Sequence, residues 1–264
     1  MKIFDCIQFF NEIEVVELRM MELGDVVDYF IIVEANKTHT GKPKEFVLEQ
    51  HLDLYKPWLD RLIYVKVTDL PDYSLDNIWV AENFQRNCIM RGLDGLANPG
   101  DKIIVSDADE IPNINTVLSY SAETNWIVLR QQMFYYYVNC RLNQTWRGSV
   151  VANYGTFDQP QQMRDFLKLH RYRNERENGG WHYSYLGADP VRIRLKAENI
   201  AESHNVLHKL GTDEELAAKV AGRTDLYNRG GWRQQMQIVD MSDDAPRALP
   251  VWLEKYPQFL CRKV

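Results

Sequence analysis

The first 112 residues alternate between two hydrophobic patterns. Short continuous apolar runs are typical of buried strands, whereas apolar residues spaced three and four apart indicate a helix packed on a sheet. In chain order we expect a strand at 2–8, a helix that Asn11 caps and that buries Ile13, Val16, Met20 and Leu23, a strand at 27–33, a short helix at 45–54, a strand at 62–67, a helix at 77–93 and a strand from residue 103. This alternation predicts an α/β fold with an open, mostly parallel sheet.

Beyond residue 112 the pattern becomes mixed. We expect a short helix at 115–120, a strand at 126–130, an aromatic run at 133–137 followed by the segment 146–151, a glycine-flexed loop at 179–185, a strand at 191–195, and surface helices from Asp213 that Trp232 and Trp252 hold down. No linker or low-complexity segment interrupts the chain. The expectation is one domain of residues 1–264, with a nucleotide-sugar-binding half at 1–112, a mixed acceptor-side half at 113–212 and a helical tail at 213–264.

Three acids follow the strand that begins at residue 103. In an extended segment Asp107 and Asp109 point to the same side, and Ala108 between them leaves room for a large ligand. Paired carboxylates suit Mg²⁺ or Mn²⁺, which keep positions open for phosphate oxygens. Ligands of open α/β sheets bind at the carboxyl ends of the strands, where Glu34 also falls. A solvated acidic turn is the alternative interpretation.

Composition narrows the function classes. The net charge is −6, which excludes a broad electrostatic surface for nucleic acid, and 45% hydrophobic residues suffice for a full core. No apolar run approaches the roughly 18 residues that span a bilayer. The four cysteines lie far apart without metal-ligand spacing, so we interpret them as reduced thiols of a cytoplasmic protein.

Two further features each allow two interpretations. Arg86 could form a helical salt bridge with Glu82, or it could hold its guanidinium beside the acidic strand to bind a phosphate or a base edge. The aromatic residues of 133–137 and 181–185 could stack on sugar rings or pack the core of a β-layer.

Six ordered motifs resemble glycosyltransferase family 17. They are Phe9-Phe10-Asn11-Glu12, the run 27–34, Thr38-His39-Thr40-Gly41-Lys42-Pro43, Phe84-Gln85-Arg86-Asn87, Ser106-Asp107-Ala108-Asp109-Glu110-Ile111-Pro112 and Gly180-Trp181-His182. The resemblance implies a GT-A-type nucleotide-sugar-binding fold, a divalent metal, inversion at the anomeric carbon, UDP-N-acetylglucosamine as the donor and a glycan hydroxyl as the acceptor. The chain differs from the animal members in having no membrane anchor, which favours a cytoplasmic enzyme.

The resemblance and the residue chemistry together predict roles for individual side chains. The metal ligands are expected to be Asp107, Asp109 and His204; the nucleotide-sugar contacts Asn11, Glu34, Arg86 and Asp107; the acceptor contacts Tyr137, Trp181 and His182; and the catalytic base Asp189, with Glu202 and His182 as the next candidates.

Two rival functions stay open at this point. A haloacid-dehalogenase-type phosphohydrolase also places Asp-x-Asp after an apolar strand, but it carries that motif near the N-terminus and has Thr or Val two residues beyond the second acid, where this chain has Ile111. The second rival function is a non-catalytic module of the same fold that binds a glycan or a nucleotide. Release of nucleotide from a donor would separate an enzyme from such a module.

Overall fold

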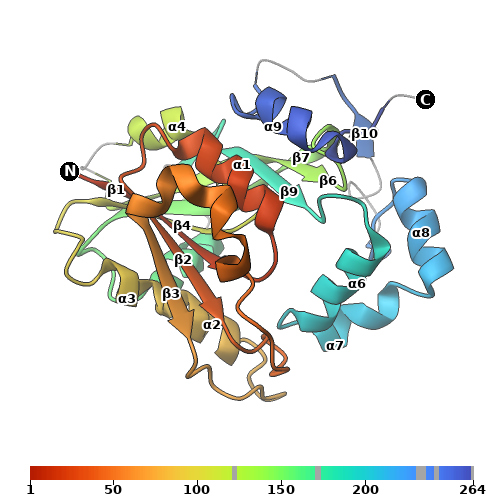
Figure 1. Cartoon of the computed structure of the whole chain (residues 1–264), viewed down its shortest axis with the longest axis horizontal. Helices are drawn as coiled ribbons and strands as arrows, with labels where there is room; N and C mark the ends of the chain where they lie inside the picture. Colours follow the sequence, from red (N-terminus) through yellow and green to blue (C-terminus); the bar gives the residue numbers. More distant parts are fainter. Residues whose placement is uncertain (121–123, 170–173, 230–235, 241–243, 263–264) are drawn as a thin grey trace.

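One open sheet runs through both halves of the chain. The computed structural model describes residues 1–120, 124–169, 174–229, 236–240 and 244–262. Within these residues the sheet has ten strands (Figure 1), which are β1 (Ile3–Phe9), β2 (Tyr29–Ala35), β3 (Leu62–Val67), β4 (Lys102–Asp107), β5 (Glu110–Pro112), β6 (Trp126–Tyr135), β7 (Cys140–Asn153), β8 (Glu175–Arg176), β9 (Gly180–Ser184) and β10 (Met236–Ile238).

The strand order is β3-β2-β1-β4-β7-β6-β9-β5, with β10 on β7 and β8 on β6. The first four strands are all parallel, as their βαβ connections require. From β4 onward the pairs are mixed: β7 is antiparallel to both β4 and β6, whereas β9 is parallel to β6. The predicted open sheet with a mixed second half is therefore confirmed.

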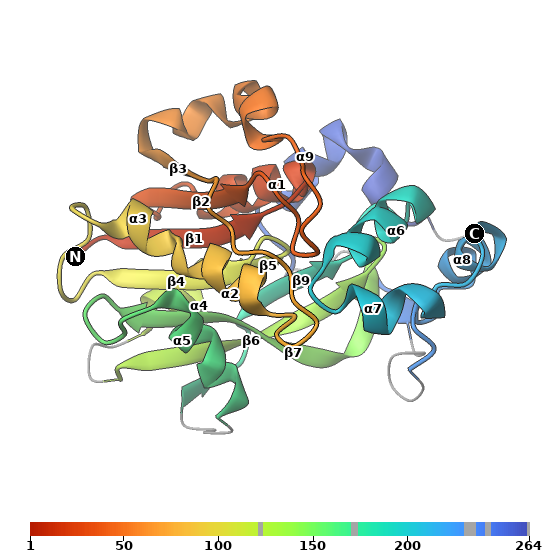
Figure 2. The ribbon, with the colours of Figure 1, turned by 90° about the horizontal axis from the view of Figure 1, so that it is seen from below.

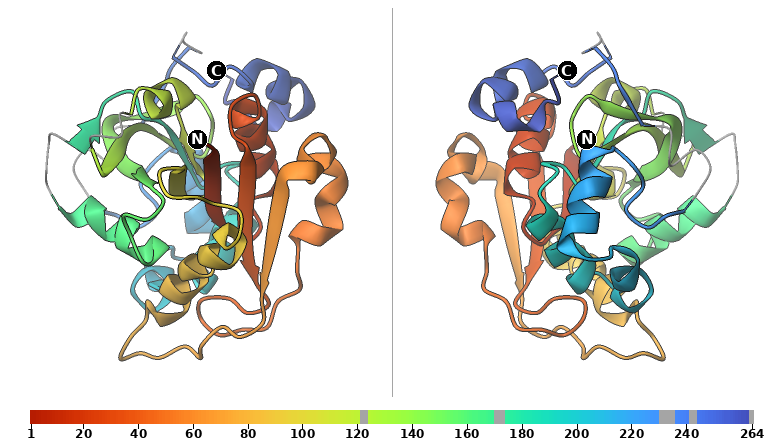
Figure 3. Two further views of the ribbon diagram at one scale, coloured as in Figure 1. Left: turned by 90° about the vertical axis from the view of Figure 1, so that its left-hand side faces the viewer. Right: turned by 90° about the vertical axis from the view of Figure 1, so that its right-hand side faces the viewer.

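Helices cover both faces of the sheet (Figure 3). In chain order the described helical segments are α1 (Ile13–Leu23), η1 (Leu48–Arg61), α2 (Val80–Asn87), α3 (Ile89–Leu93), α4 (Ile114–Leu118), α5 (Pro160–Asp165), η2 (Phe166–Lys168), α6 (Pro190–Asn199), α7 (Ser203–Val206), η4 (Leu207–Lys209), α8 (Asp213–Ala221), α9 (Leu249–Lys255) and η6 (Pro257–Phe259). One core cluster lies under α1, η1 and α4, and another lies under α2, α3 and α5.

The alternation of side chains along each strand separates these two cores. In β1, Ile3 and Ile7 pack under α1, while Phe4 and Cys6 pack under α3. Because successive strand residues face opposite sides, each central strand contributes to both layers. Burial of both faces of these strands therefore explains why their sequences are nearly continuous apolar runs.

Two predictions for the second half were wrong. Residues 180–184 form the buried strand β9 instead of a loop, and residues 190–199 form helix α6 instead of a strand. Gly180 makes the first possible, because its φ is +122° and a Cβ there would meet the Ile111 carbonyl at 2.1 Å. Asp189 makes the second possible: its carboxylate accepts a hydrogen bond from the Val191 amide at 2.9 Å, and Pro190 occupies the first helical position.

Smaller differences concern helix boundaries. The helix expected at 77–93 is divided at Cys88 into α2 and α3, and the one expected at 45–54 is the longer 3₁₀ segment η1. Glu12, not Asn11, precedes α1, and its carboxylate accepts hydrogen bonds from the Phe10 and Asn11 amides. Trp252 is buried against α1 as predicted, whereas Trp232 lies outside the described residues.

All four cysteines are free thiols, and Cys6, Cys88 and Cys140 are buried. No helix in the described part of the chain is long and apolar enough to cross a membrane.

Candidate active site

A cavity of about 320 Å³ lies at the carboxyl ends of β1, β2 and β4, the edge where open α/β sheets bind ligands. Helices α6 and α7 lie beyond these strand ends (Figure 2). Both halves of the chain line the cavity, through Gln8, Phe9, Phe10, Glu12, Ala35, Lys37, Thr38, His39, Lys44, Trp79, Glu82, Gln85, Asp107, Ala108 and Asp109 from the first and Trp146, His182, Ser184, Tyr185, Lys196, Asn199, Ile200, Ala201 and Glu202 from the second.

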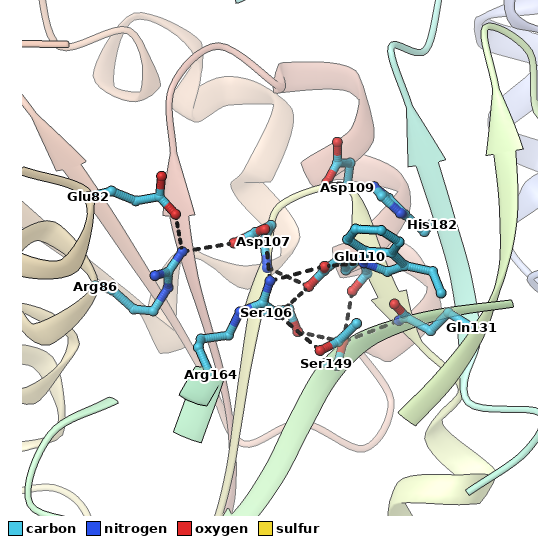
Figure 4. A network of polar contacts seen from close by, with 12 residues as sticks. Glu82, Arg86, Ser106, Asp107, Asp109, Glu110, Gln131, Ser149, Arg164 and His182 are labelled. Atoms are coloured by element: carbon cyan, nitrogen blue, oxygen red, sulfur yellow. Dashed lines mark hydrogen bonds and ion pairs between the residues drawn. The ribbon is translucent and has the colours of Figure 1, made fainter. Parts of the chain in front are cut away.

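Asp107 ends β4 and lies between two guanidinium groups (Figure 4). Its carboxylate is 2.9 Å from Arg164 Nη2 and 3.3 Å from Arg86 Nη2, and 42% of its side chain is exposed. Desolvation of the carboxylate would by itself raise the pKa of Asp107. The positive charges of Arg164 and Arg86 outweigh this effect, so the pKa of Asp107 is lowered. The group is therefore an anion with one face open to the cavity.

Asp109 has cationic and imidazole partners from the second half of the chain. Its Oδ2 is 2.8 Å from Lys196 Nζ on α6, and its Oδ1 is 3.6 Å from His182 Nε2 on β9. Burial alone would raise the pKa of Asp109, yet Lys196 and then His182 hold it far below its usual range. Asp109 is thus ionised throughout the physiological range.

Glu110, the acid after Asp109, forms an ion pair with Arg164, the same arginine that contacts Asp107. It is 1% exposed, and its carboxylate accepts hydrogen bonds from Arg164 Nη1 and Trp146 Nε1, both at 2.7 Å, and from the Asp107 amide at 2.9 Å. The sequence alone predicts no role for this acid. Its spacing of three residues from Asp107 is the local signal for the turn it stabilises.

A buried ion pair supports the motif from the α1 side. Arg19, which is fully buried, binds both carboxylate oxygens of Asp5 at 2.6 Å. The same guanidinium donates to the Glu110 carbonyl at 2.7 Å and to Ser106 Oγ at 2.9 Å. Because Asp5 lies on β1 and Glu110 follows β4, this network fixes the acidic turn relative to the central strands.

The two aspartates fit a divalent cation that takes its other ligands from a substrate. Mg²⁺ and Mn²⁺ commonly bind through one or two carboxylates plus phosphate oxygens and water, and both Asp107 and Asp109 line the cavity. No group of three possible protein ligands occurs in the described residues. His204 is exposed and does not line the cavity, so its prediction as the third ligand is corrected.

Arg86 forms the predicted helical salt bridge and lies beside the acidic strand, but it does not line the cavity, and its binding of a phosphate or a base edge stays a prediction. Its Nη2 is 2.8 Å from Glu82 Oε1, one helical turn away, and also contacts Asp107. Arg86 is only 3% exposed, since it packs between α2 and the end of β4. It is therefore held beside the acidic strand, where it acts first on Asp107.

Two predicted nucleotide contacts lie elsewhere. Glu34 is fully buried, and its carboxylate is occupied by Lys44, the Val47 and Leu48 amides and the Tyr64 hydroxyl. It holds the segment after β2 in place and does not line the cavity. Asn11 does not line the main cavity, but it lines an adjoining cavity of about 50 Å³ beside α6 that shares Asp109 and Lys196 with it. Sequence position placed both residues near the strand ends, but local hydrogen bonding turned Glu34 inward.

The predicted acceptor residues are divided by the faces of β9. His182 points into the main cavity, whereas Trp181 lines a second cavity of about 410 Å³ on the other face and donates its indole N–H to the Asp244 carbonyl. Tyr137 lines neither of these two cavities and packs against the core beside α6 and α8. Successive residues of a strand face opposite sides, so Trp181 and His182 of β9 point to different cavities. The prediction of a loop at 179–185 did not include this alternation.

Of the three predicted catalytic residues, Glu202 and His182 line the cavity and Asp189 does not. Asp189 is committed to capping α6. Glu202 is exposed at the start of α7, and within the described residues no hydrogen bond or ion pair restrains its carboxylate. The imidazole of His182 packs on Trp146, with its Nδ1 buried and unpaired among the described residues.

Several cavity residues escaped the sequence analysis. Lys196 is the most important, and the Asp-Pro signal for a helix start at 189–190 could have placed it on α6. His39 contacts Gln85 at 3.0 Å through Nε2. In the same 38–43 motif, Thr40 Oγ1 donates to the Glu198 carbonyl at 3.3 Å, which ties the loop after β2 to the end of α6.

Comparisons with known proteins agree with this geometry. Residues 1–207 match the sequence model of glycosyltransferase family 17. Over 130 residues the chain is 29% identical to the "Beta-1,4-mannosyl-glycoprotein 4-beta-N-acetylglucosaminyltransferase" of Rattus norvegicus and equally to that of Homo sapiens. Each match covers 47% of this chain and 24% of the relative, so the matched segment spans about a quarter of these curated relatives.

Solved structures are only distantly similar. HddC from Yersinia pseudotuberculosis has a TM-score of 0.37 at 9% identity, covering 70% of this chain and 91% of its own. Glucosyl-3-phosphoglycerate synthase from Mycobacterium tuberculosis, in complex with Mn²⁺, UDP-glucose and phosphoglyceric acid, has a TM-score of 0.34 at 11% identity, covering 94% and 91%. At TM-scores this low, neither similarity bears on the function of this chain.

The family assignment therefore rests on the sequence match. It covers most of the chain and includes the strands, the acidic motif and the α6 segment that form the cavity. On this ground the chain belongs to glycosyltransferase family 17.

Proposed function

We propose that the protein is a metal-dependent, inverting glycosyltransferase. Its donor is a nucleotide sugar, UDP-N-acetylglucosamine, and its acceptor is a hydroxyl group of a glycan. The names of the related enzymes support the N-acetylglucosaminyl donor. The family assignment removes the phosphohydrolase alternative.

The observation that carries this proposal is the position of Asp107, Asp109 and Lys196 at one cavity that both halves of the chain line. A nucleotide diphosphate brings negative charge to an acidic protein, so the site has to supply positive charge locally. Lys196 supplies it at the wall of the cavity, and Arg86 and Arg164, which do not line the cavity, contact the Asp107 carboxylate. A divalent cation held by Asp107 and Asp109 would neutralise the charge that develops on the departing diphosphate.

Transfer breaks the bond between the anomeric carbon and the diphosphate oxygen, which leaves with the electron pair. The acceptor oxygen forms the new bond to the anomeric carbon and loses its proton to a base on the acceptor side. Glu202 is the base in this proposal, because its carboxylate lines the cavity and the described structure shows no hydrogen bond or ion pair that would occupy it. His182 is the second candidate.

UDP binding should depend on the divalent cation. At 100 times its dissociation constant, UDP should stabilise the protein by about 2.7 kcal/mol in the presence of Mn²⁺, and EDTA should remove most of that stabilisation. Thermal unfolding monitored by fluorescence measures both values. Equal stabilisation with and without the metal would contradict the metal dependence, whereas stabilisation by GDP or CMP sugars alone would contradict only the donor identity.

The substitution Glu202→Gln should lower turnover by roughly 10²–10⁴ at unchanged UDP affinity, because it removes basicity and preserves shape. Turnover is measured as UDP release and as sugar transfer, so that donor hydrolysis also distinguishes an enzyme from a binding module. Asp189→Asn is the control and should retain activity, since Asn caps a helix as well as Asp does. Normal turnover in Glu202→Gln would transfer the role of base to His182.

A further inference from the structure

Lys196 occupies an unusual position for a cavity lysine. It extends from α6, in the second half of the chain, and its ammonium lies 2.8 Å from Asp109 Oδ2. The Lys196 side chain is 27% exposed and that of Asp109 only 9%, so the contact closes one wall of the cavity. The other two cavity lysines bind elsewhere: Lys44 pairs with Glu34, and Lys37 with Asp72.

The ammonium group of Lys196 contacts Asp109 Oδ2, an oxygen that a metal bound to Asp109 could also use. Asp109 presents its other oxygen to His182, so neither oxygen is without a neighbour. A divalent cation that coordinates Oδ2 therefore has to displace Lys196. That displacement takes a partly buried ammonium group away from the carboxylate it contacts, which is costly. The neighbouring carboxylate of Glu12, which also lines the cavity, already accepts hydrogen bonds from the Phe10 and Asn11 amides.

We propose that Lys196 is an exchangeable cation: it neutralises Asp109 in the ligand-free protein and gives up this carboxylate to the metal only when a nucleotide diphosphate supplies a new anionic partner. The inference rests on the proposed function and adds to it a residue that couples metal binding to donor binding. Only the ligand class, a nucleotide diphosphate with a divalent cation, is needed.

Motion of the side chain alone suffices for this exchange. The end of α6 is fixed to the loop after β2, because Thr40 Oγ1 donates to the Glu198 carbonyl and Lys42 lies 3.7 Å from the Glu198 carboxylate. The aromatic ring of Tyr185, 5.4 Å from Lys196 Nζ, forms a second favourable surface for the ammonium group. The flexible four-carbon chain of lysine permits the movement within a fixed cavity.

The test is a Mn²⁺ titration, followed by electron paramagnetic resonance of the free ion, with and without saturating UDP. Wild-type protein should bind Mn²⁺ weakly alone and more tightly with UDP. In Lys196→Met, Mn²⁺ affinity without nucleotide should rise by about 5- to 150-fold, the usual range of coupling between sites, and the gain on adding UDP should shrink. Lys196→Arg, which retains the charge, should stay near wild type.

Arg194→Met is the matched control. Arg194 lies on the same helix, has the same side-chain exposure of 27% and also pairs with an aspartate, Asp213, but it does not line the cavity. Its loss should leave both Mn²⁺ affinities unchanged. Lys196→Gln repeats the charge removal with a polar side chain, and thermal unfolding verifies the fold of each variant.

Unchanged Mn²⁺ affinity in both Lys196→Met and Lys196→Gln would overturn the exchange. If UDP increased Mn²⁺ affinity by the same factor in wild type and in the Lys196 variants, the coupling would be overturned, even if the variants bound Mn²⁺ more tightly without UDP. Failure of the proposed function has a different signature, because no protein in the series, wild type included, would then bind UDP in the presence of Mn²⁺.

Discussion

Asp109→Asn should lower sugar transfer by at least about two orders of magnitude. Even the outer partners of metal ligands commonly contribute 10- to 100-fold to metal affinity or activity, and Asp109 is a direct ligand in the proposed site. Asparagine retains the size and one carbonyl oxygen but removes the negative charge that Lys196 and His182 both face. Turnover with Mn²⁺ and UDP-N-acetylglucosamine, together with Mn²⁺ affinity in the presence of UDP, measures the effect.

The same substitution should leave the fold intact. Lys196 loses its carboxylate partner but keeps 27% of its side chain exposed at the cavity, so the free energy of unfolding should fall by roughly 1–3 kcal/mol, the cost of a partly buried donor without its partner, and the protein should stay folded. Asp69→Asn is a suitable control because Asp69 forms an exposed pair with Arg91 and neither residue lines the cavity. Near-normal turnover of Asp109→Asn in Mn²⁺ would show that Asp109 is not a metal ligand.

Arg19→Met should reduce the free energy of unfolding by about 3–5 kcal/mol, because it leaves the buried Asp5 carboxylate without its counter-charge. Both side chains are inaccessible, with exposures of 0% and 1%, so water cannot replace the lost partner. Urea-induced unfolding followed by circular dichroism measures the change. The variant should also lose activity, since the carbonyl of Glu110 loses the shorter of its two side-chain hydrogen bonds and keeps only that from Ser149 Oγ.

Two controls show whether the loss of stability comes from the burial of the pair or from the loss of an arginine as such. Arg91→Met removes an arginine from an exposed pair and should cost no more than about 1 kcal/mol. The double variant Arg19→Met, Asp5→Leu should recover much of the lost stability, because replacing both members of a buried pair avoids the uncompensated charge. A cost for Arg19→Met as small as that for Arg91→Met would contradict the proposed role of the buried network.

The sheet was predictable in its first half because its strands are buried on both faces. Strands β1 to β4 are apolar runs separated by amphipathic or turn-bounded segments, and parallel pairing follows from their connections. Helix α6 and strand β9 were missed for different reasons. Residues 191–195 alternate apolar and charged side chains, which indicates a strand, although Asp189-Pro190 signals a helix start. The two glycines in 179–180 indicate a loop, although Gly180 allows β9 to approach β5 closely.

The acidic motif was also predictable, since the i,i+2 spacing of Asp107 and Asp109 at a strand end is a local property. Their different environments were not. Asp107 faces two arginines and Asp109 a lysine and a histidine, and these partners lie up to 87 positions away in the chain. No periodicity in the sequence connects such distant residues.

The sequence by itself determined the α/β class, the four parallel strands, the position of the paired acids and the family. Each of these depends on short-range patterns or on ordered motifs. The tertiary structure alone decided which candidate side chains reach the cavity: it turned Glu34 into the protein interior, used Asp189 as a helix cap, and brought Lys196 and Glu202 to the site. The physical reason is that charge pairing and burial are properties of neighbours in space, which only the packing of α6 and β9 against the strand ends establishes.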